Sequence, residues 1–113
     1  MVQITKKQNL FIIDLLGFHK LWTLKHQLRI PVADVVNVYQ NQQELKQFKG
    51  IRFGTYIPFL ITAGTYIWKD KRNFWDVSHK KNTLIIELKN NSYNKLYVDV
   101  QNPTETINLL KTN

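Results

Sequence analysis

Few side chains in this sequence have the types and spacing that catalysis or metal binding requires. The chain has three histidines and no cysteine, and none of the three stands at the close spacing to a second ligand that zinc sites show. His19 and His26 fall on opposite faces of the strand predicted around them, so their rings point away from each other. We interpret these two and His79 as structural residues, and we predict neither a metal site nor a cofactor.

The motifs of nucleophilic and phosphate-transfer chemistry are also missing from the sequence. It contains no glycine-rich phosphate loop, no serine elbow and no metalloprotease helix. Thr55 and Tyr56 carry hydroxyl groups, but no base can be identified beside them. We therefore predict that the protein is not an enzyme. An active site assembled from scattered residues is the alternative, and a deep polar pocket with a strongly perturbed acid or base would support it.

Positive charge is the sequence feature with the most functional weight. The chain has 16 Lys and Arg residues against 8 Asp and Glu residues, which gives a formal net charge of +8. Such a balance favours contact with phosphate, a lipid head group or an acidic protein. Two predicted turns at opposite ends of one strand hold most of the candidate contact residues, so the alternative is two separate patches of solvated charge. The candidates are Arg52, Lys69, Lys71, Arg72, Lys80 and Lys81.

The three tryptophans admit two interpretations. Set against so much positive charge, Trp22, Trp68 and Trp75 suit a platform on which the bases of a nucleic acid stack. Large aromatic side chains in alternating strands are normally buried, however, and we predict core packing for all three. Electrostatic binding of nucleic acid through the loop lysines stays the alternative function.

Length and composition predict one globular domain over residues 1–113. Hydrophobic residues make up 43% of the chain, with 4 Gly and 3 Pro, as in ordinary globular proteins. The lack of cysteine excludes disulfides and favours a reducing compartment, so we predict a cytoplasmic location. Lys6 and Lys7 precede the apolar stretch Leu10–Phe18, but Asp14 interrupts it and a membrane span requires roughly 20 residues. We predict neither a signal peptide nor a transmembrane segment.

The stretch Gly50–Val77 is the predicted framework of the fold. It reads as an irregular loop that leads into a strand, a turn and a second strand. Side chains alternate over Ile61–Trp68, which is typical of a half-buried strand. The polar residues Asp70–Asn73 then predict a hairpin turn before the aromatic pair Phe74 and Trp75.

Period-two alternation predicts further strands on both sides of this hairpin. They comprise two strands within Met1–Leu16, then Phe18–Ile30, Val35–Tyr39, Leu84–Leu88 and Leu96–Val100. The segment Gln40–Lys49 has too few apolar residues to bury a face. We interpret it as an exposed loop with room for one helical turn.

The sequence changes period near its C-terminus. Asn102 is a predicted N-cap, Pro103 suits the first helical position, and Glu105 stands three residues after the cap. Ile107 and Leu110 supply the apolar stripe of a short helix. Because so short a helix is unstable alone in water, we expect it to dock on the sheets.

Three short blocks resemble a known family. They are Gly-Thr-Tyr-Ile-Pro at Gly54–Pro58, Ala-Gly-Thr at Ala63–Thr65 and Phe-Trp-Asp-Val at Phe74–Val77. Together with Asn102–Glu105 they resemble a family of small, mostly bacterial proteins of unknown function with a pleckstrin-homology-like (PH-like) domain. The resemblance covers almost the whole chain, with Phe59 where the family often has glycine. It implies a mainly β fold, a PH-like barrel of about seven antiparallel strands in two packed sheets, closed by one C-terminal α-helix.

These observations favour a non-catalytic binding or scaffold module. Its expected partner is a protein segment or an anionic surface such as a lipid head group, and nucleic acid is the alternative. A pair of packed sheets has edges that a peptide can extend by strand addition. The family transfers a fold to this chain and no catalytic residues.

Overall fold

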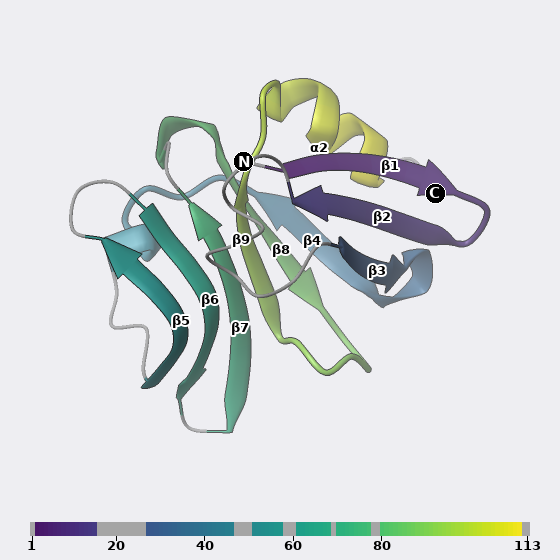
Figure 1. Ribbon diagram of the computed structural model, residues 1–113. Helices are drawn as coiled ribbons and strands as arrows, with labels where there is room; N and C mark the ends of the chain where they lie inside the picture. The colour runs from purple at the N-terminus through teal and green to yellow at the C-terminus, as the bar shows by residue number, and fades with distance from the viewer. Residues whose placement is uncertain are drawn as a thin grey trace.

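The computed structural model describes residues 2–15, 27–46, 51–57, 61–68, 70–77 and 80–111. In this part of the chain, nine strands form two sheets, and one α-helix follows them (Figure 1). The described helices include none with the length and apolar character needed to span a bilayer. The mainly β architecture with a C-terminal helix agrees with the prediction.

The smaller sheet has the strand order β1-β2-β3. Strands β1 (Val2–Lys7) and β2 (Leu10–Leu15) form an antiparallel hairpin. Its two-residue turn contains Gln8 at φ 58°, in the left-handed region that such turns require. Strand β3 (Gln27–Pro31) pairs antiparallel with β2 and ends at the proline, as predicted. The rest of the long strand predicted before it lies outside the described residues.

The larger sheet has the strand order β4-β8-β9-β7-β6-β5. A 3-10 turn, η1 (Val32–Asp34), leads from the small sheet into β4 (Val35–Tyr39), which has the predicted bounds. The other strands are β5 (Ile51–Ile57), β6 (Ile61–Trp68), β7 (Lys71–Val77), β8 (Thr83–Leu88) and β9 (Lys95–Asp99).

Strand number and direction differ from the prediction of about seven antiparallel strands. The described part of the chain has nine strands, and β7 and β9 are parallel neighbours. The cause is the position of β8, which pairs with β4 and with β9 but not with β7. Strand β9 therefore fills the place beside β7. The described strands form two open sheets and do not close into a barrel.

The central hairpin differs from the prediction at both of its ends. Strand β5 pairs with β6 along its whole length, where the sequence predicts an irregular loop. The hairpin turn is also shorter, because Trp68 already pairs with Lys71. Asp70 has φ 64°, and aspartate tolerates this left-handed conformation. The polar residues after it therefore belong to β7 and not to the turn.

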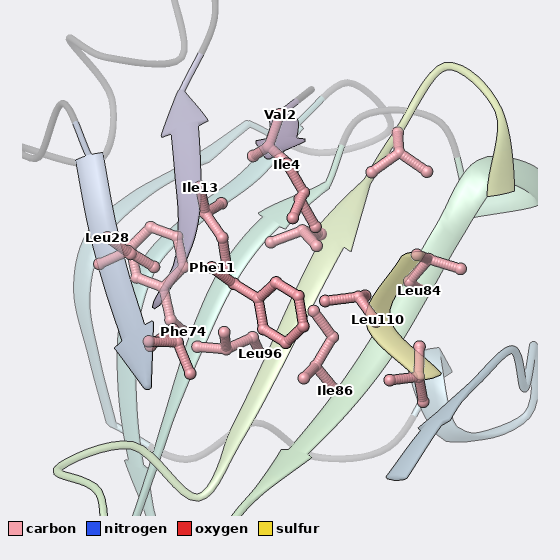
Figure 2. Packing of buried hydrophobic residues seen from close by; sticks show 14 of the residues in the cluster. Val2, Ile4, Phe11, Ile13, Leu28, Phe74, Leu84, Ile86, Leu96 and Leu110 are labelled. Atoms are coloured by element: carbon pink, nitrogen blue, oxygen red, sulfur yellow. The ribbon is translucent and has the colours of Figure 1, made fainter. Parts of the chain in front are cut away.

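The main core lies between the small sheet, one face of the large sheet and the C-terminal helix α2 (Pro103–Lys111) (Figure 2). Phe11 of β2 and Phe74 of β7 are both fully buried there. The predicted inward faces of β8 and β9 are confirmed, since Leu84 and Leu96 both belong to this core. Burial of each such side chain stabilises the fold by about 1.5–3 kcal/mol.

The capping prediction for α2 is confirmed. The Asn102 side-chain oxygen accepts a hydrogen bond from the Glu105 backbone N–H at 3.1 Å, and the Thr106 hydroxyl donates to the Asn102 carbonyl at 2.9 Å. Leu110 is only 1% exposed, while Ile107 is half-buried against the same core. The helix is thus anchored at its start by the cap and near its end by Leu110.

Candidate functional site

The three predicted basic residues whose side chains are described do not form one cluster. Lys71 and Arg72 begin β7, whereas Lys81 lies in the 3-10 turn η3 (Lys80–Asn82) that follows the other end of β7, and all three are exposed. A strand of this length separates its ends by roughly 20 Å. The structure therefore has two basic turns, as the alternative interpretation predicts. For Arg52 and Lys80 the described part is the backbone only.

Other candidates fall on residues that are not described. His19, His26, His79, Trp22 and Lys69 lie outside the described residues. Within the described part of the chain, no three His, Cys, Asp or Glu side chains are grouped as a metal site would need.

Arg72 is engaged in holding a neighbouring loop. Its guanidinium carbon lies 5.2 Å from the centre of the Tyr93 ring, a distance typical of a cation–π contact. The Arg72 backbone N–H donates to the Asn94 side chain at 2.8 Å, and the Asn94 N–H donates to the Arg72 carbonyl at 2.7 Å. These contacts fasten the β8–β9 loop to β7, which gives Arg72 a structural role.

Trp75 is buried on the second face of the large sheet, opposite the main core. It is 4% exposed, and its ring stacks on Tyr97 with the centroids 3.9 Å apart and the planes 10° apart. The Tyr66 ring meets it edge-on at 6.1 Å. The core prediction is thus confirmed for Trp75, whose position excludes it from an exposed stacking platform. The Trp68 side chain is not described.

A short 3-10 turn, η2 (Glu44–Lys46), covers this aromatic face. Leu45 is only 2% exposed and belongs to the same cluster as Trp75 and Ile85. The prediction of an exposed loop for Gln40–Lys49 is therefore wrong for this part of it. Leu45 docks the turn on the aromatic cluster, and the neighbouring Glu44 carboxylate adds polar contacts to the same face.

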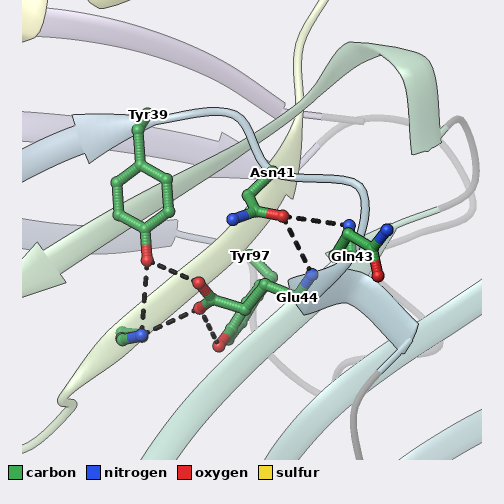
Figure 3. Close-up of polar contacts among 6 residues, drawn as sticks. Tyr39, Asn41, Gln43, Glu44 and Tyr97 are labelled. Carbon is green, nitrogen blue, oxygen red and sulfur yellow. Dashed lines mark hydrogen bonds and ion pairs between the residues drawn. The ribbon is translucent and has the colours of Figure 1, made fainter.

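Glu44 is the centre of the polar contacts that hold η2 (Figure 3). Its Oε1 accepts a hydrogen bond from the Tyr39 hydroxyl at 2.7 Å. Its Oε2 accepts from the Tyr97 hydroxyl at 2.8 Å and from Lys95 Nζ at 2.8 Å. We call Tyr39, Glu44, Lys95 and Tyr97 the Glu44 clasp.

A local turn presents Glu44 to these partners. The Asn41 side-chain oxygen accepts hydrogen bonds from the backbone N–H groups of Gln43 at 3.0 Å and Glu44 at 3.1 Å (Figure 3). Asparagine commonly caps a helical turn in this way. Strand register brings Lys95 and Tyr97 to the same face, since they are two residues apart on β9.

The clasp has the electrostatics of a structural contact. Burial alone would raise the pKa of Glu44, but hydrogen bonds from Lys95, Tyr39 and Tyr97 outweigh it and lower the pKa below its ordinary value. Burial, together with the neighbouring carboxylate, raises the pKa of Tyr39 and of Tyr97. At neutral pH the acid is therefore ionised and both hydroxyls keep their protons. Such groups are suited to holding η2 in place and are poor proton-transfer groups.

An open groove of about 460 Å³ lies between β1 and α2. Its walls are Val2–Ile4 of β1, Val100–Asn102, and Glu105, Thr106 and Leu109 of α2. Figure 1 shows α2 alongside β1 at this side of the small sheet. This groove is the candidate binding site.

Strand β1 offers backbone groups to the groove. It is an edge strand of the small sheet, and the hairpin turn fixes which residues face β2. Because hydrogen-bonded and non-hydrogen-bonded pairs alternate from Lys7 and Leu10, the backbone groups of Val2 and Ile4 point away from β2. Val2 forms a parallel bridge with Val100. Among the described residues, no backbone partner stands on the outer side of Ile4.

No single sequence motif predicts the Glu44 clasp or the groove between β1 and α2. The spacing of two residues between Lys95 and Tyr97 indicates that they share one face of a strand. It does not indicate that Glu44 lies over them. The groove depends on how α2 is placed relative to β1, which follows from tertiary packing.

Comparison with protein-family models, with curated proteins and with solved structures finds no match for this chain.

Proposed function

We propose that this protein is a non-catalytic binding module of the PH-like type that holds an extended segment of another protein. The observation that carries the proposal is the outer side of β1 at Ile4, which has no backbone partner among the described residues and opens on the groove beside α2. A peptide in this groove adds a strand to the small sheet.

The dimensions of the groove suit a short contact. Three residues of β1 line it, and at about 3.4 Å per residue they span roughly 10 Å. Because Val2 already bridges Val100, Ile4 is the one of the three whose outward N–H and C=O have no backbone partner among the described residues. Three or four residues of a partner fit along such an edge, with alternate side chains directed into the groove. Each backbone hydrogen bond contributes about 0.5–1.5 kcal/mol net, so the affinity depends on both hydrogen bonds and groove contacts.

The order of elements supports the PH-like assignment. Strands in two packed sheets are followed by one capped helix that docks on the core. The parallel β7–β9 pair is a departure from an all-antiparallel barrel. The PH-like proposal therefore rests on the order of elements and on the docked helix, and not on closure of the described sheets.

Nucleic-acid binding is the second candidate, and the net charge of +8 favours it. Two observations favour the protein segment instead. The two basic turns stand at opposite ends of β7, and Trp75 is buried. An electrostatic complex with nucleic acid would lose affinity steeply as salt is added.

The test is selection of binding peptides from a random linear library on the purified full chain, followed by an NMR titration. We expect the amide signals of Val2–Lys6 and Glu105–Leu109 to shift. Selection of no peptide, or shifts confined to Lys71, Arg72 and Lys81, would contradict the proposal. A parallel titration with single-stranded DNA at two salt concentrations tests the second candidate.

A further inference from the structure

The charge of the groove is opposite in sign to the charge of the whole chain. Glu105 is the one ionisable side chain among the groove-lining residues of the described chain. The other polar walls are uncharged amides and a hydroxyl, at Gln3, Gln101, Asn102 and Thr106. The groove is thus a locally acidic site on a protein with a net charge of +8.

The Glu105 carboxylate is placed to meet a partner. The residue is exposed in the first turn of α2, where the helix dipole favours a negative charge. Its backbone N–H is bonded to the Asn102 side chain. Among the described residues, the side chain of Glu105 has no hydrogen bond or ion pair.

On the basis of the proposed peptide binding, we infer that the groove selects a segment with a lysine or arginine opposite Glu105. The carboxylate attracts a cation and repels an acid at that position. An acidic or phosphorylated segment would need a cation in the groove wall, and the described wall contains none.

The selected segment is therefore extended, with one basic residue among neutral neighbours. A strongly basic segment would be repelled by the net charge of the whole protein. The apolar wall residues Val2, Ile4 and Leu109 match an apolar side chain elsewhere in the segment. The contact between the basic side chain and Glu105 sets the register of the segment along β1, and backbone pairing with β1 supplies the remaining contacts.

The test uses three capped probe peptides, Thr-Val-Thr-X-Thr-Val-Thr, in which X is Lys, Gln or Glu. Each is titrated into the full chain at low salt, and the amide signals of β1 are followed by NMR. Because an exposed ion pair is worth little, we expect about a two- to fivefold step in affinity from Lys to Gln, and again from Gln to Glu. Added salt should reduce both steps.

Glu105→Gln is the decisive variant, because glutamine is also accepted three residues after an N-cap. It should abolish the preference for Lys while the Gln peptide still binds. Asp70→Asn is the matched control: it removes one exposed acid at the β6–β7 turn, outside the groove, and asparagine tolerates the same φ of 64°. This control should keep the preference.

The outcomes separate the two proposals. Equal binding of the three peptides at β1 would overturn the inference and leave strand addition standing. A preference for Lys that persists in Glu105→Gln would also overturn it. If no peptide shifts the β1 signals, strand addition itself is contradicted.

Discussion

The carboxylate of Glu44 accepts a 2.8 Å hydrogen bond from the hydroxyl of Tyr97, a residue 53 positions later in the chain. The contact joins η2 to β9 on the aromatic face of the large sheet. The described part of the large sheet thus packs against the main core on one face, and η2 docks on the aromatic cluster of the other face. The groove beside β1 stands apart from this second cluster.

Glu44→Gln should lower the free energy of unfolding. The neutral amide loses the charge that pairs with Lys95. Its NH2 group also replaces one acceptor, either the oxygen that accepts from Tyr39 or the oxygen that accepts from Tyr97 and Lys95. The Glu44 side chain is 11% exposed, and hydrogen bonds to a charged group contribute about 1.5–3 kcal/mol. We expect a loss in that range by urea denaturation. Glu105→Gln, the same chemical change at an exposed position, should cost less than about 0.5 kcal/mol.

The Glu44 clasp should also make stability depend on acidic pH. The pKa of Glu44 in the folded protein lies below its ordinary value of 4.5. Its contribution is therefore complete above pH 4.5 and is lost as the pH falls through the folded-state pKa. The difference in unfolding free energy between the unaltered protein and Glu44→Gln should shrink between pH 5 and pH 2. A constant difference over that range would contradict the assignment.

Leu45→Ala tests whether η2 is docked or merely solvated. Leu45 is 2% exposed, and truncation of a buried leucine typically costs about 2–5 kcal/mol. Val36→Ala is the control, because Val36 is 57% exposed on β4. If both variants unfold at the same urea concentration, then η2 does not contribute to the fold.

The sequence predicts those parts of the fold whose signals are local. Strand β4 and the cap of α2 are correct because proline, β-branched residues, and the Asn102 and Glu105 spacing act within a few residues. The docking of η2 is missed because Leu45 packs with Trp75 and Ile85, and the Glu44 carboxylate bonds to Lys95 and Tyr97, which all come much later in the chain. The parallel β7–β9 pair is missed for a related reason, since alternation gives a strand its faces but does not identify its neighbours.

The edge of β1 can be blocked without disturbing its hairpin. In the alternation that starts at the turn, the backbone N–H of Lys6 points away from β2, so Lys6→Pro keeps the β1–β2 pairing and places the proline ring on the outer side of an edge strand, where proline is tolerated. Binding of the selected peptide should weaken at least fivefold, because the ring obstructs the approach of a segment to the outer side of β1. The readout is the NMR titration of the β1 amides.

Arg29→Pro is the matched control for this variant. It removes one positive charge and one outward N–H from β3, the opposite edge of the same sheet. Peptide affinity should stay within a factor of two. Equal weakening by both variants would indicate a general loss of structure, and unchanged binding in Lys6→Pro would contradict strand addition at β1.

The docking of α2 should be required for folding. Leu110 is 1% exposed in the main core, so Leu110→Ala should cost about 2–5 kcal/mol, a large share of the stability of a small domain. Lys111→Ala, the adjacent exposed residue, should change stability by less than about 0.5 kcal/mol.

Truncation of the chain after Gln101 tests the whole helix. The shortened chain should be unfolded or aggregated, since the core face that Leu110 covers is left open to water. Thermal unfolding followed by circular dichroism distinguishes these cases. A cooperative transition of the shortened chain near the full-length temperature would show that the sheets are stable without α2, and that the groove between β1 and the helix is not supported by the core.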